Sequence, residues 1–216
     1  MELWNDWGYQ WDFTWCGVGS RDSITPEIRS LMVWIGESLA LMGGVLCTGD
    51  APGSDTHFWE GYNFGRQPGM PPAQIYYTRK KNQRGSVHNA REGFHELEEY
   101  PGTMHIAQDI AFDARGSFEG LFPSGIALHT RNAFQVLGED LKSPRRFTVF
   151  FAKPVGKRGM VKGGTNTATQ ISRKNKIPTI NLWEPEQVDG FVKWITQQLN
   201  DKGIPVPARR TFSDQP

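Results

Sequence analysis

The apolar residues of this chain fall into two patterns that alternate along the sequence. Short runs, bounded by glycine or polar residues, are typical of buried strands and occur at 13–19, 45–49, 74–77, 147–151 and 179–182. Between the runs, apolar residues recur every three or four positions, which predicts helices over 26–42, 54–64, 124–137, 165–175 and 185–199. Thr25 and Ser54 are expected as helix N-caps, because their hydroxyl oxygens accept hydrogen bonds from free backbone amides.

Strands that alternate with helices pair in parallel through right-handed crossovers. The pattern therefore predicts an α/β fold, a Rossmann-like three-layer sandwich with a mainly parallel sheet and a helical insertion. The insertion covers about 80–125, where helices are expected over 88–97 and 105–114 with a break at Tyr100-Pro101-Gly102. A single domain would span 13–200, followed by a mobile tail over 201–216.

Residues 1–12 are interpreted as an aromatic N-terminal arm. Trp4, Trp7, Trp11 and Trp15 all lie within the first fifteen residues, and the first three have helix-like spacing. Packing of this arm on the domain or on a second subunit is favoured over a stacking platform for nucleobases. The apolar surface of the arm and of the insertion is the reason to consider a homo-oligomer.

Composition narrows the classes of partner. The 24 Lys and Arg residues nearly balance the 23 Asp and Glu residues, so the basic surplus of a typical nucleic-acid coat is missing. Single-stranded DNA is therefore a less expected partner than a small ligand. Cys16 and Cys47 fall in apolar runs and suit buried strands better than a disulfide or a metal site. We predict no cofactor and no metal.

The cellular compartment of the protein is inferred from the targeting and membrane segments that the sequence does not show. The first residues have neither the basic start nor the apolar core of a signal peptide, and no apolar run reaches the roughly 20 residues of a membrane helix. We therefore expect a soluble, cytoplasmic protein without membrane association.

Three strand-to-helix junctions combine glycine with hydroxyl and charged residues. The first contains Gly17, Gly19, Ser20 and Arg21; the second contains Thr48, Gly49, Asp50, Ala51, Gly53, Ser54 and Asp55; the third contains Lys162, Gly163, Gly164, Thr165, Asn166 and Thr167. Glycine lets the backbone approach a phosphate, and the amides at the start of the next helix favour an anion. In a parallel sheet these loops meet at one edge, where ligands bind.

The order of these loops resembles the SLOG superfamily, which groups DprA/Smf DNA-processing proteins, Lonely Guy (LOG) cytokinin-activating enzymes and nucleotide-sensing domains. Gly19-Ser20-Arg21 is similar to the GSR of its first loop, and Thr48 to Asp55 is similar to its TGxAxGxD loop. Gly164 to Ala168 resembles its third loop, and Arg131-Asn132 resembles the Arg-Asn pair of the DprA branch. The resemblance covers about 13–183.

The resemblance implies a Rossmann-like domain that binds a nucleotide or a nucleotide-derived molecule, in a sensing or sequestering role. Its phosphate would lie across Gly19-Ser20-Arg21, Gly53-Ser54 and Gly164-Thr165, and the base or ribose would contact Asp55, Asn166 and residues of the insertion. Arg131, beside Asn132, could hold a second phosphate or be a surface helix arginine. Two alternatives stay open: N-glycosidic hydrolysis of a nucleoside monophosphate, as in the LOG branch, and DprA-like binding of single-stranded DNA. Thr169-Gln170 stand where the LOG branch has its glutamate, so whether the ligand is turned over is left open.

Hydrolysis would need a carboxylate at the ligand, and Asp50, Asp55 and Glu139 are the candidates. Asp50 is the first candidate for a general base, whereas Asp55 can also serve the dipole of the helix that follows it.

Several histidine and basic residues are also candidates for the ligand site, although each could instead have a structural or surface role. His57, His88, His95 and His105 are interpreted as packed or solvated helix residues, since their spacing with nearby glutamates does not match a metal site. His129 is a candidate to line the ligand pocket. A basic loop is interpreted as a lid over phosphates, and it contains Lys153, Lys157, Arg158 and Lys162.

Overall fold

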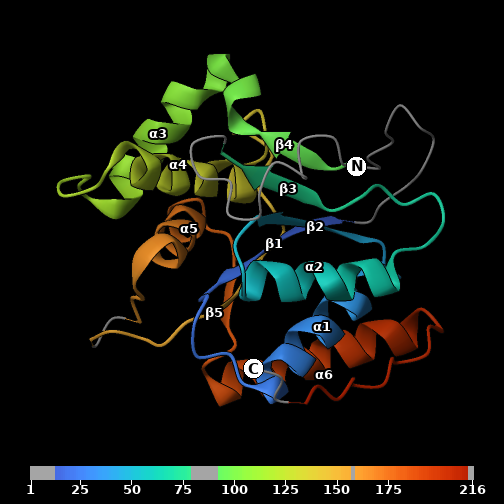
Figure 1. Ribbon diagram of the computed structural model, residues 1–216. Coiled ribbons are helices and arrows are strands. Elements are labelled where there is room, and N and C mark those ends of the chain that lie inside the picture. Colours follow the sequence, from blue (N-terminus) through green and yellow to red (C-terminus); the bar gives the residue numbers. More distant parts are fainter. Residues whose placement is uncertain (1–12, 79–91, 157–158, 214–216) are drawn as a thin grey trace.

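The computed structural model describes residues 13–78, 92–156 and 159–213 (Figure 1). Six parallel strands form one sheet in the order β4-β3-β2-β1-β5-β6. The strands are β1 (Phe13–Gly19), β2 (Gly44–Gly49), β3 (Gln74–Tyr77), β4 (Phe94–Glu96), β5 (Thr148–Phe151) and β6 (Thr179–Asn181). The predicted α/β class and parallel sheet are confirmed.

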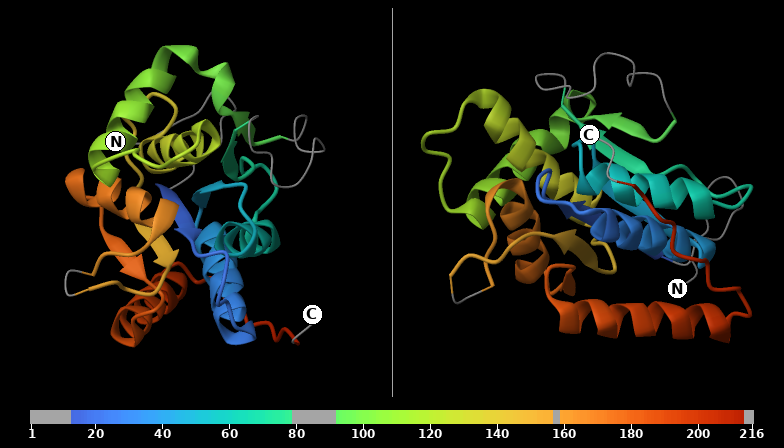
Figure 2. Two further views of the ribbon diagram at one scale, coloured as in Figure 1. Left: turned by 60° about the vertical axis from the view of Figure 1, so that its left-hand side comes forward. Right: turned by 60° about the horizontal axis from the view of Figure 1, so that its bottom comes forward.

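Helices cover both faces of the sheet, which gives three layers (Figures 1 and 2). One face carries α1 (Pro26–Leu41), α2 (Ser54–Gly65) and α6 (Pro185–Asp201), and the other carries α3 (Pro101–Arg115), α4 (Pro123–Leu137) and α5 (Gly163–Lys174). A short 3-10 helix, η3 (Leu97–Glu99), precedes α3. Thr25 is the N-cap of α1, as predicted, and its Oγ1 accepts a hydrogen bond from the Ile28 amide at 3.4 Å.

Side chains along β1 point to opposite faces of the sheet, and the hydrophobic interior is correspondingly divided into two cores. Phe13 and Trp15 pack towards α1, α2 and α6, whereas Cys16 and Val18 pack towards α4 and α5. All four side chains are buried, because β1 lies inside the sheet with helices on both sides. This central position places the end of β1 at the middle of the sheet edge.

Cys16 and Cys47 are opposite each other in β1 and β2, and both are buried free thiols. Burial is the main cause that raises the pKa of each thiol. They therefore act as small apolar side chains, as expected. In the described part of the chain, the helices are too short or too polar to cross a bilayer.

The segment after β3 departs from the sequence-based prediction. Residues 94–97, expected within a helix, form β4 and the start of η3, while 88–91 lie outside the described residues. β4 hydrogen-bonds to β3 in register, which extends the sheet by one edge strand. Pro101 begins α3 instead of separating two helices, since proline fits the first helical position, where no amide partner is needed.

Ser54 was wrongly predicted as an N-cap. The N-cap of α2 is Gly53, whose φ of 87° lies in the left-handed region, and Ser54 is the first helical residue. A Cβ at position 53 would lie 2.8 Å from the Arg21 Cα, so glycine is required where the second loop crosses the first.

The structure describes contacts of the C-terminal segment but not of the N-terminal arm. The arm residues Trp4, Trp7 and Trp11 lie outside the described residues. After α6, the chain passes along α1, where Trp34 Nε1 donates a hydrogen bond to the Pro207 carbonyl at 2.8 Å. Arg210 pairs with Glu37 at 3.1 Å. The mobility expected of the tail stays a prediction.

Candidate functional site

The sheet has a topological switch point between β1 and β5. The chain leaves β1 for α1 on one face, and leaves β5 for α5 on the other. Loops that diverge in this way open a crevice beyond the carboxyl ends of the two strands. A cavity of about 420 Å³ lies there. Its lining consists of Val18, Gly19, Ser20, Arg21, Asp22, Ala51, Asp55, Gly125, Leu128, His129, Arg131, Asn132, Lys162, Gly163, Gly164 and Thr165.

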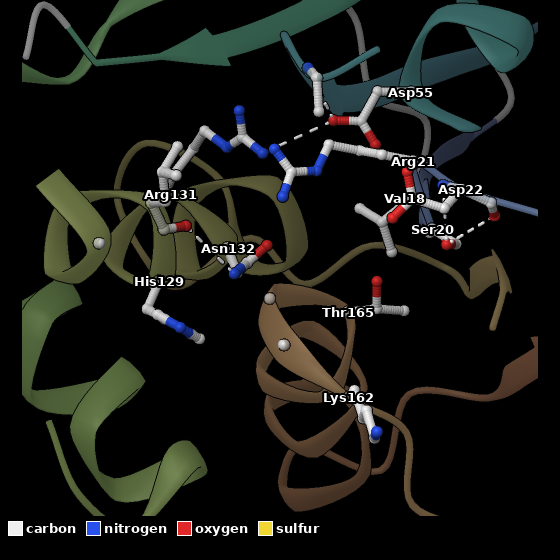
Figure 3. A pocket seen from close by; sticks show the side chains of 16 residues that line it. Val18, Ser20, Arg21, Asp22, Asp55, His129, Arg131, Asn132, Lys162 and Thr165 are labelled. Atoms are coloured by element: carbon white, nitrogen blue, oxygen red, sulfur yellow. Dashed lines mark hydrogen bonds and ion pairs between the residues drawn. The ribbon is translucent and has the colours of Figure 1, made fainter. Parts of the chain in front are cut away.

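Arg131 is the buried cation of this cavity. It projects from α4, is only 8% exposed, and places Nη2 3.6 Å from Oδ2 of Asp55 at the start of α2 (Figure 3). The same carboxylate oxygen accepts a hydrogen bond from the Ala51 amide at 3.2 Å. Asp55 therefore anchors the guanidinium and ties the second loop to α4.

Arg21 brings a second guanidinium to the same wall. Figure 3 shows its side chain extending from the first loop towards Arg131 and Asp55. Burial lowers the pKa of Arg131, the carboxylates of Asp55 and Asp50 raise it, and the positive charge of Arg21 lowers it again. Asp55 offsets part of the positive charge of Arg131, and Arg21 adds a second cation to the wall that an anion can meet.

The opposite wall is the N-terminus of α5. Its N-cap is Lys162, which makes no side-chain capping bond, and Gly163, Gly164 and Thr165 follow it along the cavity. The side-chain oxygen of Asn166 accepts from the Val161 amide at 3.3 Å, so it fixes the preceding loop. The first amides of α5, with the helix dipole, form a favourable environment for a negative charge.

His129 adds an uncharged ring to the α4 side. Its Nδ1 lies 2.7 Å from Oγ1 of Thr167 in α5. Burial, followed by the charges of Arg115 and Arg131, lowers the pKa of His129 to about 4. The imidazole is therefore neutral at pH 7 and holds α4 and α5 together beside the cavity.

Eleven of the predicted ligand-binding residues meet at the cavity: Gly19, Ser20, Arg21, Ala51, Asp55, Arg131, Asn132, Lys162, Gly163, Gly164 and Thr165. Gly17, Thr48, Gly49, Gly53, Ser54, Asn166 and Thr167 do not line it. Ligand contact by either group stays a prediction.

Residues in the second loop that do not line the cavity have packing roles. Thr48 Oγ1 donates a hydrogen bond to the Gly17 carbonyl at 2.6 Å, and Ser54 Oγ donates to the Ser20 carbonyl at 2.9 Å. A Cβ on Gly49 would lie 2.5 Å from both Arg131 Cζ and Asp55 Oδ2. These residues therefore bring the first loop, the second loop and α4 close together.

The lining also contains residues that were not predicted, namely Val18, Asp22, Gly125 and Leu128. Gly125 and Leu128 lie on the same helix as Arg131 and Asn132, and spacings of three and four residues place them on one side of it. Counting back from the predicted Arg131-Asn132 pair in steps of three and four residues would have identified Gly125 and Leu128 as lining residues.

The catalytic candidates separate in space. Asp55 lines the cavity, whereas Asp50 is 3% exposed behind it and acts electrostatically on Arg131. Glu139 follows the C-terminus of α4, where its Oε1 lies 3.0 Å from Nδ1 of His95. This position is at the opposite end of the sheet, so Glu139 cannot serve as the carboxylate of the cavity.

The remaining candidates lie elsewhere. His57 packs near Glu60 in α2, with 3.8 Å between Nδ1 and Oε2, and His105 is exposed on α3. Lys157, Arg158 and His88 lie outside the described residues. Across 13–78, 92–156 and 159–213, no three His, Cys, Asp or Glu side chains gather to hold a metal ion.

Comparison with known proteins gives one distant structural neighbour. No family model and no curated protein sequence matches the chain. DNA processing protein A from Helicobacter pylori, solved in a study of its single-stranded DNA binding mode, is 15% identical with a TM-score of 0.49. The similarity covers 88% of this chain and 81% of that chain. Membership of the SLOG superfamily stays a prediction from the loop motifs.

Proposed function

We propose that the cavity binds a nucleotide or nucleotide-derived phosphate and holds it without turnover. The observation that carries the proposal is the paired guanidinium groups of Arg21 and Arg131 opposite the uncapped start of α5. A phosphate between them would pair with both arginines and accept from helix amides, which are the interactions that phosphate groups favour.

The size of the cavity favours more than a bare phosphate. Small-molecule sites usually have volumes of about 300–1,000 Å³, and this cavity has about 420 Å³. Its cations lie on α4, the first loop and α5, so the anionic part of the ligand is expected between these three elements. The remaining space extends along α4 past His129.

Binding without turnover follows from how the polar side chains are engaged. Arg131 and the Ala51 amide both contact Asp55 Oδ2. Burial lowers the pKa of His129 to about 4, so at pH 7 the imidazole is neutral and is a weak general acid for a leaving group. These contacts support a role in sensing or sequestering the ligand.

The test is equilibrium dialysis against a nucleotide panel, followed by mass spectrometry of the bound and free pools. We expect an intact nucleotide in the bound pool. Arg21→Gln removes an exposed side chain without a folding risk, and it should weaken binding about tenfold, since a hydrogen bond between charged groups contributes about 1.5–3 kcal/mol. The matched control is Arg29→Gln, which removes a surface arginine paired with Glu60 on α2.

Three results would contradict the proposal. If Arg21→Gln and the unsubstituted protein bind the nucleotide with equal affinity, the phosphate does not bind at this wall. A free base with a ribose phosphate would establish hydrolysis, and Asp55, the candidate carboxylate that lines the cavity, would then be the first residue to test for a catalytic role. Preferential binding of a single-stranded oligonucleotide, with affinity falling about 10³–10⁵-fold between 50 and 200 mM salt, would establish the DNA-binding alternative.

A further inference from the structure

An apolar wall runs from the cavity along the N-terminal half of α4. We define it by Phe118, Leu121, Gly125, Leu128 and His129. The last three line the cavity directly. Phe118 joins them through its ring, whose centroid lies 6.3 Å from that of His129, and Leu121 reaches over Gly125. The wall therefore begins at the polar part of the cavity and leads away from it.

Gly125 makes a recess in this wall that the fold does not require. It lies in the first turn of α4, where alanine is favoured over glycine for helix stability. A Cβ there would meet only the Leu121 side chain, at 3.6 Å, which is ordinary van der Waals contact. Its φ is not in the left-handed region. Neither crowding nor backbone geometry explains a glycine at this position.

We propose that the recess over Gly125 receives the planar base of the bound nucleotide. This inference rests on the proposed function, because it uses the phosphate position at Arg21, Arg131 and α5 to orient the ligand. A flat base would lie on Gly125 beside the Leu121 side chain, with Leu128 and the imidazole of His129 next to it. Base stacking and apolar contact are sequence-tolerant interactions, since every base has a π-face.

Two further features suit a neutral heteroaromatic ring. His129 is uncharged at pH 7, and Thr167 fixes its ring through the 2.7 Å contact with Nδ1. Phe118 is itself held by Phe112, with ring centroids 5.3 Å apart at an interplanar angle of 79°. The wall is therefore pre-formed, so little side-chain entropy is lost when a base packs against it.

The binding mode predicts which ligands are distinguished. A wall of aliphatic and aromatic groups separates a nucleotide from a sugar phosphate, because only the nucleotide covers the recess. It discriminates weakly among the four bases, since stacking does not read the hydrogen-bonding edge. The site would therefore select the class of nucleoside phosphates.

The experiment compares Gly125→Leu with a matched control. Gly102→Leu also places a leucine in the first turn of a helix that begins with a proline, and a Cβ there meets no atom within 4 Å. Calorimetry would measure the Kd of each variant for the four nucleoside 5′-monophosphates and for ribose 5-phosphate, with thermal melts to confirm folding. We expect Gly125→Leu to weaken nucleotide binding tenfold or more, to leave ribose 5-phosphate unchanged, and Gly102→Leu to change neither.

The base recess and the phosphate site can be disproved separately. Equal affinity of the unsubstituted protein for ribose 5-phosphate and the nucleotides would overturn the base recess and leave the phosphate site standing. Unchanged nucleotide affinity in Gly125→Leu would also overturn the base recess and leave the phosphate site standing. Binding of neither probe by the unsubstituted protein would remove the proposed function, and the recess with it.

Discussion

His129 should make the protein less stable in mild acid. A histidine in the unfolded chain titrates near pH 6.5, whereas burial lowers the pKa of His129 in the folded protein to about 4. Between these values the unfolded state binds more protons than the folded state. The stability is therefore complete above pH 6.5 and falls as the pH decreases towards 4.

The magnitude follows from the two pKa values. Lowering the pH from 7 to 5 would cost about 1.8 kcal/mol for the full shift. Part of the ring faces the open cavity, and screening by water there reduces the expected cost to about 1 kcal/mol. This cost belongs to His129 alone, so it appears as a difference between the protein and a His129 variant.

The assay is urea denaturation at pH 7 and pH 5 for the protein and for His129→Gln, whose amide can still hydrogen-bond Thr167. The free energy of unfolding should fall about 1 kcal/mol further in the protein than in the variant. His105→Gln, at an exposed position on α3, is the control and should follow the parent. The same pH dependence in parent and His129→Gln would refute the reasoning.

Two other perturbations test the packing around the site and the C-terminal segment. Gly49→Ala would place a methyl group 2.5 Å from Arg131 Cζ and Asp55 Oδ2, so we expect a loss of about 1–3 kcal/mol in urea denaturation; an unchanged midpoint would mean that α4 moves away freely. Truncation after Gly203 removes the hydrogen bond at Trp34 Nε1, so we expect red-shifted tryptophan emission and a stability loss of about 1–2 kcal/mol; unaltered emission would count against the packed segment.

Much of the fold could be predicted because its core elements are strongly periodic. β1, β2, β3, β5 and β6 are short apolar runs, and the helices between them carry clear apolar faces. β4 was missed, because it is a three-residue edge strand with the sequence Phe-His-Glu in a charged region. Its strand character comes from the hydrogen-bonding edge of β3, which local pattern does not reveal.

The sequence predicted the part of the site that the loops form. It did not predict the part that the face of α4 contributes. The ends of β1 and β2 and the start of α5 were all located from glycine and hydroxyl residues. Gly125 and Leu128 were missed although they share the helical period of Arg131 and Asn132, because the packing of α4 on the sheet decides which of its faces meets the cavity. In the second loop, glycine serves close packing against Arg21 and Arg131 more than exposure to the cavity.

The strand order also sets when the cavity can exist during synthesis. β1 lies between β2 and β5, yet Gly19 and its partner in β5, Phe151, are 132 positions apart in the sequence. At about 5–20 residues per second, a ribosome takes on the order of ten seconds to supply that partner. Until then one edge of β1 is unpaired, and α5, which follows β5 in the chain, is made later still. A nascent chain therefore lacks the complete cavity, and a ligand of the class we propose would stabilise only the completed sheet.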